Sequence, residues 1–184
     1  MSNDDPPDFT ERQLTTRLVY DGRLLKVRED DVRLPDGRTA RREYVEHPGA
    51  VMIVALPDEK TVLIERQFRY APQRHFFELP AGRMEAGEDP LQTAQRELRE
   101  ECGYVAADWR HLASLYGCIG YSNERIELYL ARGLNHVGPA LDDGEFLEVT
   151  AVRLDEALEW VRTGRITDIK TAAGLAWIRL FVSR

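Results

Sequence analysis

Three carboxylates crowd one face of a segment whose composition strongly favours a helix. Glu97 and Glu101 are four positions apart and Glu100 is three positions from Glu97, so a helix brings all three side chains together. Like charges at this spacing destabilise a helix unless a cation neutralises them. Mg²⁺ and Mn²⁺ prefer oxygen ligands and suit such a cluster. The alternative is a solvated acidic face that is paired with Arg96 and Arg99.

The residues around the cluster favour the metal site over the solvated face. Five residues separate Gly82 from Glu88, and seven more separate Glu88 from the run Arg96-Glu97-Leu98-Arg99-Glu100-Glu101-Cys102-Gly103. This spacing resembles the signature box of the Nudix hydrolases, with Tyr104 in place of the usual aliphatic residue. The resemblance implies an α/β/α sandwich and an enzyme that hydrolyses a nucleoside diphosphate linked to another moiety.

The resemblance also implies how the metal is held. Glu97 and Glu101 are the expected principal ligands of Mg²⁺, for which Mn²⁺ can substitute, and the backbone carbonyl of Ala81 is a third ligand. Glu100 is expected to ligate the metal or to hold its water molecules from the same face. Metal ions neutralise charge on phosphate oxygens and lower the pKa of bound water.

Four further box residues have expected structural roles. Glu88 and Arg96 are expected to pair and to tie the loop to the helix. Gly82 serves the geometry of the turn, because glycine readily adopts positive φ. Gly103 is well placed to end the helix as a C-cap.

The general base is expected outside the box. The ADP-ribose pyrophosphatase branch uses a glutamate in an acidic loop well downstream, and the matching run here is Asp142-Asp143-Gly144-Glu145-Phe146-Leu147-Glu148. Glu145 aligns with that glutamate as the base or as a ligand of a further metal, and Asp143 and Glu148 are the alternatives. Glu100 and Glu101 complete the expected catalytic set. Taken alone, such a run is more often a solvated turn.

The segment before the box points to the substrate class. Arg66-Gln67-Phe68-Arg69-Tyr70 resembles the ADP-ribose and nucleotide-sugar pyrophosphatases. Arg69 is expected to face the substrate diphosphate, because arginine offers a planar fork that matches phosphate oxygens, and Arg66 is a weaker candidate. Glu78 is expected to contact the terminal ribose or a metal-bound water. The alternative for both arginines is a salt bridge at a strand edge.

One departure from the branch bears on the choice of sugar. Cys118 and Ile119 stand where the ADP-ribose branch commonly has a proline, while the following residues still look like that branch. The expected reaction is hydrolysis of ADP-ribose to AMP and ribose 5-phosphate, with GDP-mannose or another nucleotide sugar as the alternative substrate. A non-catalytic ADP-ribose sensor is a further alternative, but sensors usually carry a degraded box.

The chain divides near residue 48, where His47-Pro48-Gly49 interrupts the pattern. Residues 1–47 read as a small β-meander with turns at Asp21-Gly22 and Asp36-Gly37, and residues 48–184 as the hydrolase domain. The meander resembles the N-terminal subdomain of the ADP-ribose pyrophosphatase branch, which implies a homodimer. Strands are predicted over 50–56, 61–68, 111–116, 125–132 and 146–153, and helices over 88–102, 154–163 and 168–182, with Thr167 as the N-cap of the last.

Composition excludes several other classes of protein. The net charge of −7 argues against general affinity for nucleic acid, which requires a basic surface. Cys102 and Cys118 have neither metal-ligand spacing nor a disulfide pattern. No apolar run reaches 18 residues and the N-terminus resembles no signal peptide, so no membrane association and a cytoplasmic location are expected.

Overall fold

The computed structural model describes residues 6–141 and 144–182 of the chain. Contacts between Cα atoms divide the chain into two compact units. The smaller unit consists of Met1–His47 and Cys118–Glu124, and the larger consists of Pro48–Gly117 and Arg125–Arg184. Residues 118–124 join the smaller unit although they lie far from it in the sequence, which the pattern of residues gave no reason to expect.

The smaller unit is an antiparallel three-stranded meander. Its strands are β1 (Arg12–Asp21), β2 (Lys26–Arg33) and β3 (Thr39–Glu46), in the order β1-β2-β3. Gly37 has φ +86° in the second turn, a conformation that favours glycine. The segment 118–124 is attached through the Val45 amide, which donates a hydrogen bond of 2.8 Å to the carbonyl of Tyr121.

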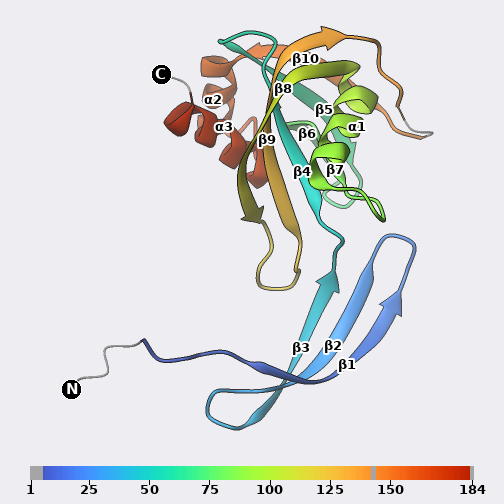
Figure 1. Ribbon diagram of the computed structural model, residues 1–184, viewed down its shortest axis with the longest axis vertical. Coiled ribbons are helices and arrows are strands. Elements are labelled where there is room, and N and C mark those ends of the chain that lie inside the picture. The colour runs from blue at the N-terminus through green and yellow to red at the C-terminus, as the bar shows by residue number, and fades with distance from the viewer. Residues whose placement is uncertain (1–5, 142–143, 183–184) are drawn as a thin grey trace. The chain divides into compact units, whose positions relative to one another are not determined.

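In its described residues the larger unit has two sheets and three helices (Figure 1). The four-stranded sheet has the order β7-β4-β9-β8 and the three-stranded sheet the order β10-β5-β6. Its strands are β4 (Ala50–Ala55), β5 (Thr61–Arg69), β6 (Arg74–Glu78), β7 (Ala81–Arg83), β8 (Tyr104–Tyr116), β9 (Arg125–His136) and β10 (Leu147–Arg153). Its helices are α1 (Pro90–Cys102), α2 (Leu154–Arg162) and α3 (Ile169–Phe181).

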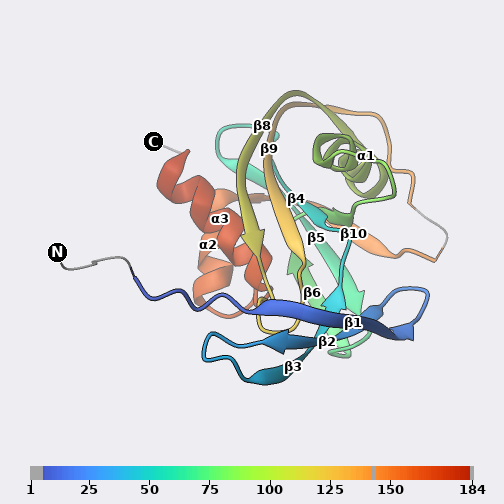
Figure 2. The same ribbon diagram turned by 60° about the horizontal axis from the view of Figure 1, so that its bottom comes forward.

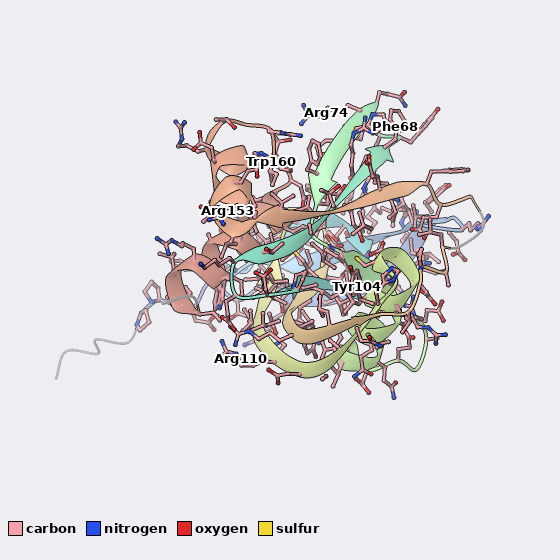
Figure 3. All side chains as sticks on the ribbon, turned by 90° about the horizontal axis from the view of Figure 1, so that it is seen from above. Phe68, Arg74, Tyr104, Arg110, Arg153 and Trp160 are labelled. Carbon is pink, nitrogen blue, oxygen red and sulfur yellow. The ribbon has the colours of Figure 1, made fainter. Side chains whose placement is uncertain are left out.

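The helices of the larger unit cover opposite faces of its sheets, with α1 on one side and α2 and α3 on the other (Figures 1 and 2). This is the α/β/α sandwich predicted from the sequence. Trp160 lies on α2, and Phe68 and Arg74 lie close together at the end of the β5–β6 hairpin (Figure 3).

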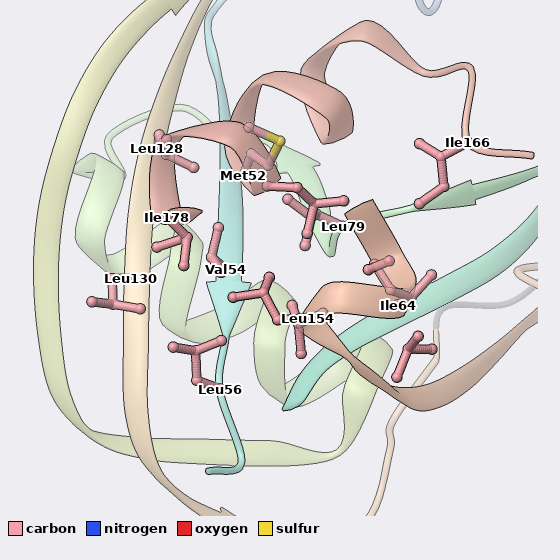
Figure 4. Close-up of a cluster of buried hydrophobic side chains, with 14 of the residues drawn as sticks. Met52, Val54, Leu56, Ile64, Leu79, Leu128, Leu130, Leu154, Ile166 and Ile178 are labelled. Atoms are coloured by element: carbon pink, nitrogen blue, oxygen red, sulfur yellow. The ribbon is translucent and has the colours of Figure 1, made fainter. Parts of the chain in front are cut away.

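The hydrophobic core lies on both faces of β4, as its uninterrupted apolar run predicts. Met52 and Val54 pack on one face in a cluster that includes Leu79, Leu154 and Ile178 (Figure 4). The alternate residues of β4 pack on the other face against α1, where Ala94 and Leu98 are fully buried; these β4 residues are Val51, Ile53 and Ala55. The core therefore fixes α1, with its acidic residues, against the four-stranded sheet.

Some boundaries differ from the prediction. The strand expected over 111–116 already begins at Tyr104, directly after Gly103 ends α1. The short strands β6 and β7 carry too few residues for a periodic pattern and were not predicted. The N-cap of α3 is Asp168 and not Thr167, because the Asp168 carboxylate accepts a 3.0 Å hydrogen bond from the Thr171 amide. Within the described residues, no helix is long and apolar enough to cross a membrane.

Candidate active site

The helix α1 begins and ends where its sequence provides caps. The Asp89 side chain accepts hydrogen bonds from the amides of Leu91, at 2.9 Å, and Gln92, at 3.1 Å. Gln92 completes a capping box with the Asp89 backbone. At the other end Gly103 has φ +72°, and its amide donates to the Arg99 carbonyl at 3.0 Å. These caps set α1 so that all three box acids fall within its last two turns.

Arg96 joins the box loop to two of the acids on the helix. One edge of its guanidinium donates to both oxygens of Glu88, at 2.8 and 3.0 Å. Another nitrogen of Arg96 donates to Glu97 at 2.8 Å and to Glu100 at 2.9 Å. This pairing with Arg96 is part of the alternative to a metal site, a solvated acidic face held by salt bridges to Arg96 and Arg99. Without a metal, therefore, Glu97 and Glu100 share the single positive charge of Arg96, which is also paired with Glu88.

The hydrogen bonds from Arg96 hold the pKa of Glu88 down at about 2, although partial desolvation opposes the shift. The pKa of Arg96 is raised for the same reason. Glu97 behaves differently, because burial raises its pKa to about 7 despite its contact with Arg96. Glu88 is thus a permanent anion that anchors the loop, whereas Glu97 is a buried acid whose charge is poorly compensated.

Glu101 lies deeper, with 6% of its surface exposed, and its carboxylate accepts a 3.2 Å hydrogen bond from the Ala81 amide. Beside it lies Glu65, which is 3% exposed and accepts a 3.1 Å hydrogen bond from the Cys102 thiol. Burial is the main cause that raises the pKa of Glu101, and repulsion by the charge of Glu65 is the second. Burial also raises the pKa of Glu65. Neither acid forms an ion pair with the described residues. Two buried carboxylates without a cation are costly, so both groups favour the protonated form, and a bound positive ion would allow them to ionise.

The fit of a metal to these residues can be judged from their packing. Among the described residues, no three His, Cys, Asp or Glu side chains are grouped closely enough to hold a metal ion as they stand. Two of the acids are turned onto Arg96, so a metal would have to displace that contact. The role expected for Gly82 in a turn with positive φ is wrong, because Gly82 lies in β7 and does not have positive φ. Its lack of a side chain instead makes room for Glu97, because a Cβ at Gly82 would lie only 1.9 Å from the Glu97 carboxyl carbon. Oxygen donors from Glu97, Glu101 and the adjacent Ala81 backbone suit Mg²⁺ or Mn²⁺.

A second polar cluster surrounds Glu78, the last residue of β6. Arg69 donates two hydrogen bonds to Glu78, at 2.7 and 2.9 Å, and Lys170 of α3 pairs with the same carboxylate. Burial raises the pKa of Glu78, but these two cations outweigh it and leave the pKa lowered. Asp168 pairs with Lys170 at 2.9 Å. The four side chains line a cavity of about 400 Å³ together with Tyr70 and Phe76.

The strand β5 links the two clusters. Glu65 and Glu78 are directly opposite each other in the β5–β6 ladder, so their side chains share one face of the sheet. Arg69 lies on the Glu65 face of β5, since side chains alternate along a strand. Arg66 lies on the opposite face, in register with Phe77, so the structure separates it from the other predicted residues.

The downstream loop brings Glu145 near the box. The charge of Glu145 contributes to raising the pKa of Glu65, Glu97 and Glu101, which places its carboxylate within electrostatic reach of all three. Glu148 pairs with Arg66 in the β5–β10 ladder and therefore lies on the face away from Glu65. Asp143, the remaining alternative, lies outside the described residues.

Glu65, Lys170 and Asp168 were not singled out from the sequence. Glu65 follows the apolar run of β5, where a charged residue at a buried position is an unusual signal. The other two lie at the start of α3, 92 residues from Glu78 in the case of Lys170, and no local pattern connects them. Their place in the site follows only from the tertiary fold.

Comparison with known proteins supports the family inferred from the box. Residues 45–171 match the NUDIX domain, and residues 11–45 match the nucleoside diphosphate sugar hydrolase N-terminal domain. The chain is 40% identical over 174 residues to the methanol dehydrogenase activator of Bacillus methanolicus, covering 94% of both chains. It is 36% identical over 172 residues to the ADP-ribose pyrophosphatase of Bacillus subtilis, covering 92% of this chain and 93% of that protein.

The fold has a counterpart of known structure. The crystal structure of an ADP compounds hydrolase superposes with a TM-score of 0.82 at 22% sequence identity, and the match covers 95% of each chain. At this identity the match speaks to the fold alone. Because the NUDIX domain spans most of the chain and the relatives align over nearly their full length, this protein belongs to the Nudix hydrolase family.

Proposed function

We propose that this enzyme is a metal-dependent pyrophosphohydrolase that cleaves ADP-ribose to AMP and ribose 5-phosphate. The observation that carries the proposal is the pairing of Glu65 with Glu78 across the β5–β6 ladder. Glu78 lines the cavity that holds Arg69, and Glu65 opposite it accepts a hydrogen bond from Cys102, the neighbour of Glu101 in the sequence. Arg69, which is suited to a diphosphate, therefore lies on the same face of the β5–β6 ladder as Glu65, the acid beside the proposed metal ligands of α1.

Glu97, Glu101 and the Ala81 carbonyl would hold Mg²⁺, with Glu100 as a further ligand or a partner of its water molecules. The ion would neutralise charge on the non-bridging phosphate oxygens and lower the pKa of the attacking water. Mn²⁺ has the same preference for oxygen and is proposed as a substitute. Arg96 would keep its two hydrogen bonds to Glu88 when Glu97 and Glu100 turn to the metal.

Arg69 would bind the diphosphate with the edge of its guanidinium that Glu78 leaves free. Its Nε and one terminal nitrogen are used on Glu78, which leaves the other terminal nitrogen to donate to phosphate. Glu78 and Lys170 would thus hold the arginine in a fixed orientation, and Glu78 stays available to a ribose hydroxyl or a metal-bound water. The proposal rests on Arg69 and not on Arg66, which lies on the other face.

Glu145 is proposed as the general base. It would accept a proton from water as the water oxygen attacks one phosphorus atom and the bond from that phosphorus to the bridging oxygen breaks. One water is consumed, and the products are AMP and ribose 5-phosphate. The box acids are poor bases once they hold a metal, because the adjacent positive charge lowers their pKa. The proximity of Glu145 to Glu97 and Glu101 supports this role.

The choice of ADP-ribose is supported by the name of the Bacillus subtilis relative and by the match of residues 11–45 to the nucleoside diphosphate sugar hydrolase N-terminal domain. The same N-terminal match is compatible with another nucleotide sugar such as GDP-mannose. The complete set of box acids argues against a sensor that binds without cleaving. We also propose a homodimer in the cytoplasm that binds neither nucleic acid nor membrane.

A substrate panel tests the proposal. The purified chain is incubated with ADP-ribose, GDP-mannose, NADH, diadenosine polyphosphates and dGTP in Mg²⁺ or Mn²⁺, and the products are identified. We expect AMP and ribose 5-phosphate from ADP-ribose at the highest kcat/KM. A higher kcat/KM for dGTP would refute the proposed substrate class, and a higher value for GDP-mannose would establish the alternative sugar.

A further inference from the structure

Every residue from Glu78 to Ala81 forms a hydrogen bond with another element of the larger unit. Glu78 is held by Arg69 and Lys170, as described above. The Leu79 amide donates to the Thr171 hydroxyl at 2.9 Å. The Pro80 carbonyl accepts from the Ile53 amide at 2.8 Å, and the Ala81 amide donates to Glu101 at 3.2 Å. This short segment therefore connects the diphosphate cluster to the proposed metal ligands.

Thr171 ties this segment to the start of α3. Its side chain is fully buried, and its hydroxyl donates to Asp168 at 2.6 Å while it accepts from Leu79. Asp168 is also the N-cap of α3, accepting from the Thr171 amide. One hydroxyl thus connects the cap of a helix to the backbone that leads into Ala81.

Helix α3 also packs directly against Leu79, which strengthens its connection to the segment from Glu78 to Ala81. A Cβ at Gly174 would lie 2.7 Å from the Leu79 side chain and 3.1 Å from that of Met52. Gly174 lies three residues after Thr171, on the same face of α3. Leu79 is fully buried, so its amide has no access to water if the hydroxyl is removed. The backbone would then shift, or the amide would remain unpaired.

We propose that Thr171 is a positioning residue for the metal centre. By fixing Leu79, it holds the Ala81 backbone against Glu101, so the Ala81 carbonyl and the Glu101 carboxylate keep the spacing that a metal needs. Asp168 assists by orienting the Thr171 hydroxyl. This inference rests on the proposed function, because it assigns Thr171 to the metal site described there.

The test compares Thr171→Val, which removes the hydroxyl at nearly constant volume, with Thr171→Ser, which retains it. Thr163→Val is the matched control, because the Thr163 hydroxyl donates to the Glu159 carbonyl at the end of α2, away from the site. Binding of Mn²⁺ to each purified full-length variant is measured by electron paramagnetic resonance of the free ion. The kcat and KM for ADP-ribose and the Tm are measured in parallel.

We expect Thr171→Val to bind Mn²⁺ about tenfold more weakly, in the range found for groups that orient metal ligands. Its kcat should fall while KM for ADP-ribose changes little. Thr171→Ser and Thr163→Val should stay within about twofold of the wild type in Mn²⁺ affinity, well below that range. If Thr171→Val does not fold, Thr171→Ala removes the same hydroxyl without adding bulk and should show the same loss of affinity.

A lower Tm with unchanged Mn²⁺ affinity and kcat in Thr171→Val, or in Thr171→Ala, would show a merely structural role and overturn the inference. In that case an active, Mn²⁺-binding wild type leaves the proposed function intact. A wild type that neither binds Mn²⁺ nor cleaves ADP-ribose would overturn the proposed function and this inference together.

Discussion

The acidic residues of the site differ in how far neighbouring cations offset their negative charge. Glu88 and Glu78 are paired with cations that lower their pKa values, whereas burial raises the pKa values of Glu97 and Glu101. Acids whose pKa values are shifted in this way are common at functional sites. The difference separates the acids that hold the structure together from those proposed to hold the metal.

Replacing either poorly compensated acid should remove activity without unfolding the protein. Glu97→Gln and Glu101→Gln keep the shape of the side chain but remove the charge that binds the metal. We expect kcat/KM for ADP-ribose to fall by roughly two to four decades, since metal ions supply several kcal/mol of transition-state stabilisation. The metal-free Tm should not decrease. Near-wild-type activity in either variant would contradict the metal assignment.

The thermal stability of the metal-free protein should decrease as pH rises, and a bound metal should counteract this decrease. The pKa of Glu97 is about 7 in the folded state, above its ordinary value of 4.5, so the native state binds more protons than the unfolded state between these two values. Loss of the Glu97 proton should therefore lower the metal-free Tm as pH rises from about 4.5 to about 7. Mn²⁺ should raise the Tm more at pH 8 than at pH 5. Thermal unfolding with and without Mn²⁺ checks this, and an equal rise in Tm at both pH values would speak against it.

The proposed base has a matched control on the same segment. Glu145→Gln should lower kcat strongly with little change in KM, because it removes the proton acceptor and leaves the diphosphate contacts in place. Glu148→Gln should leave kcat unchanged, because Glu148 lies on the face of the β5–β10 ladder away from Glu65. Steady-state kinetics of both variants decides the matter. If both keep wild-type kcat while Glu100→Gln abolishes turnover, the base lies in the box.

At the scale of elements, the arrangement of strands makes the two arginines of β5 unequal. Arg69→Lys should raise KM for ADP-ribose by about tenfold, because lysine cannot bind Glu78 with two nitrogens and a phosphate with a third. Arg66→Lys is the control and should behave like the wild type, because Arg66 lies on the opposite face. Equal effects of the two substitutions on KM would refute the assignment of the diphosphate to Arg69.

Local chemistry explains why some elements were predictable and others were not. The start and end of α1 follow from Pro90 and Gly103, and β4 follows from its apolar run. The short strand β7 was not predictable, because its three residues show no strand pattern and form a strand only by pairing with β4. The same holds within the site: the box acids are visible as a pattern, whereas Glu65 reaches Cys102 only through a contact between residues 37 positions apart.

At the scale of the whole molecule, the N-terminal meander leaves apolar side chains in solvent. Leu14, Leu18, Val19 and Tyr20 of β1 are each more than 40% exposed. A three-stranded sheet gains stability by covering such a surface. We expect light scattering to give twice the chain mass at micromolar concentration, and Leu18→Lys to shift the mass toward that of one chain. An active wild-type monomer under these conditions would contradict the proposed homodimer.

The proposed function is tested most directly by the ratio of kcat/KM for ADP-ribose to that for dGTP, measured in Mg²⁺ and repeated after the metal is removed with excess EDTA. We expect a ratio well above one in Mg²⁺, with AMP and ribose 5-phosphate as products, and no turnover of either substrate in EDTA. A ratio below one, or hydrolysis of ADP-ribose that persists in EDTA, would contradict it.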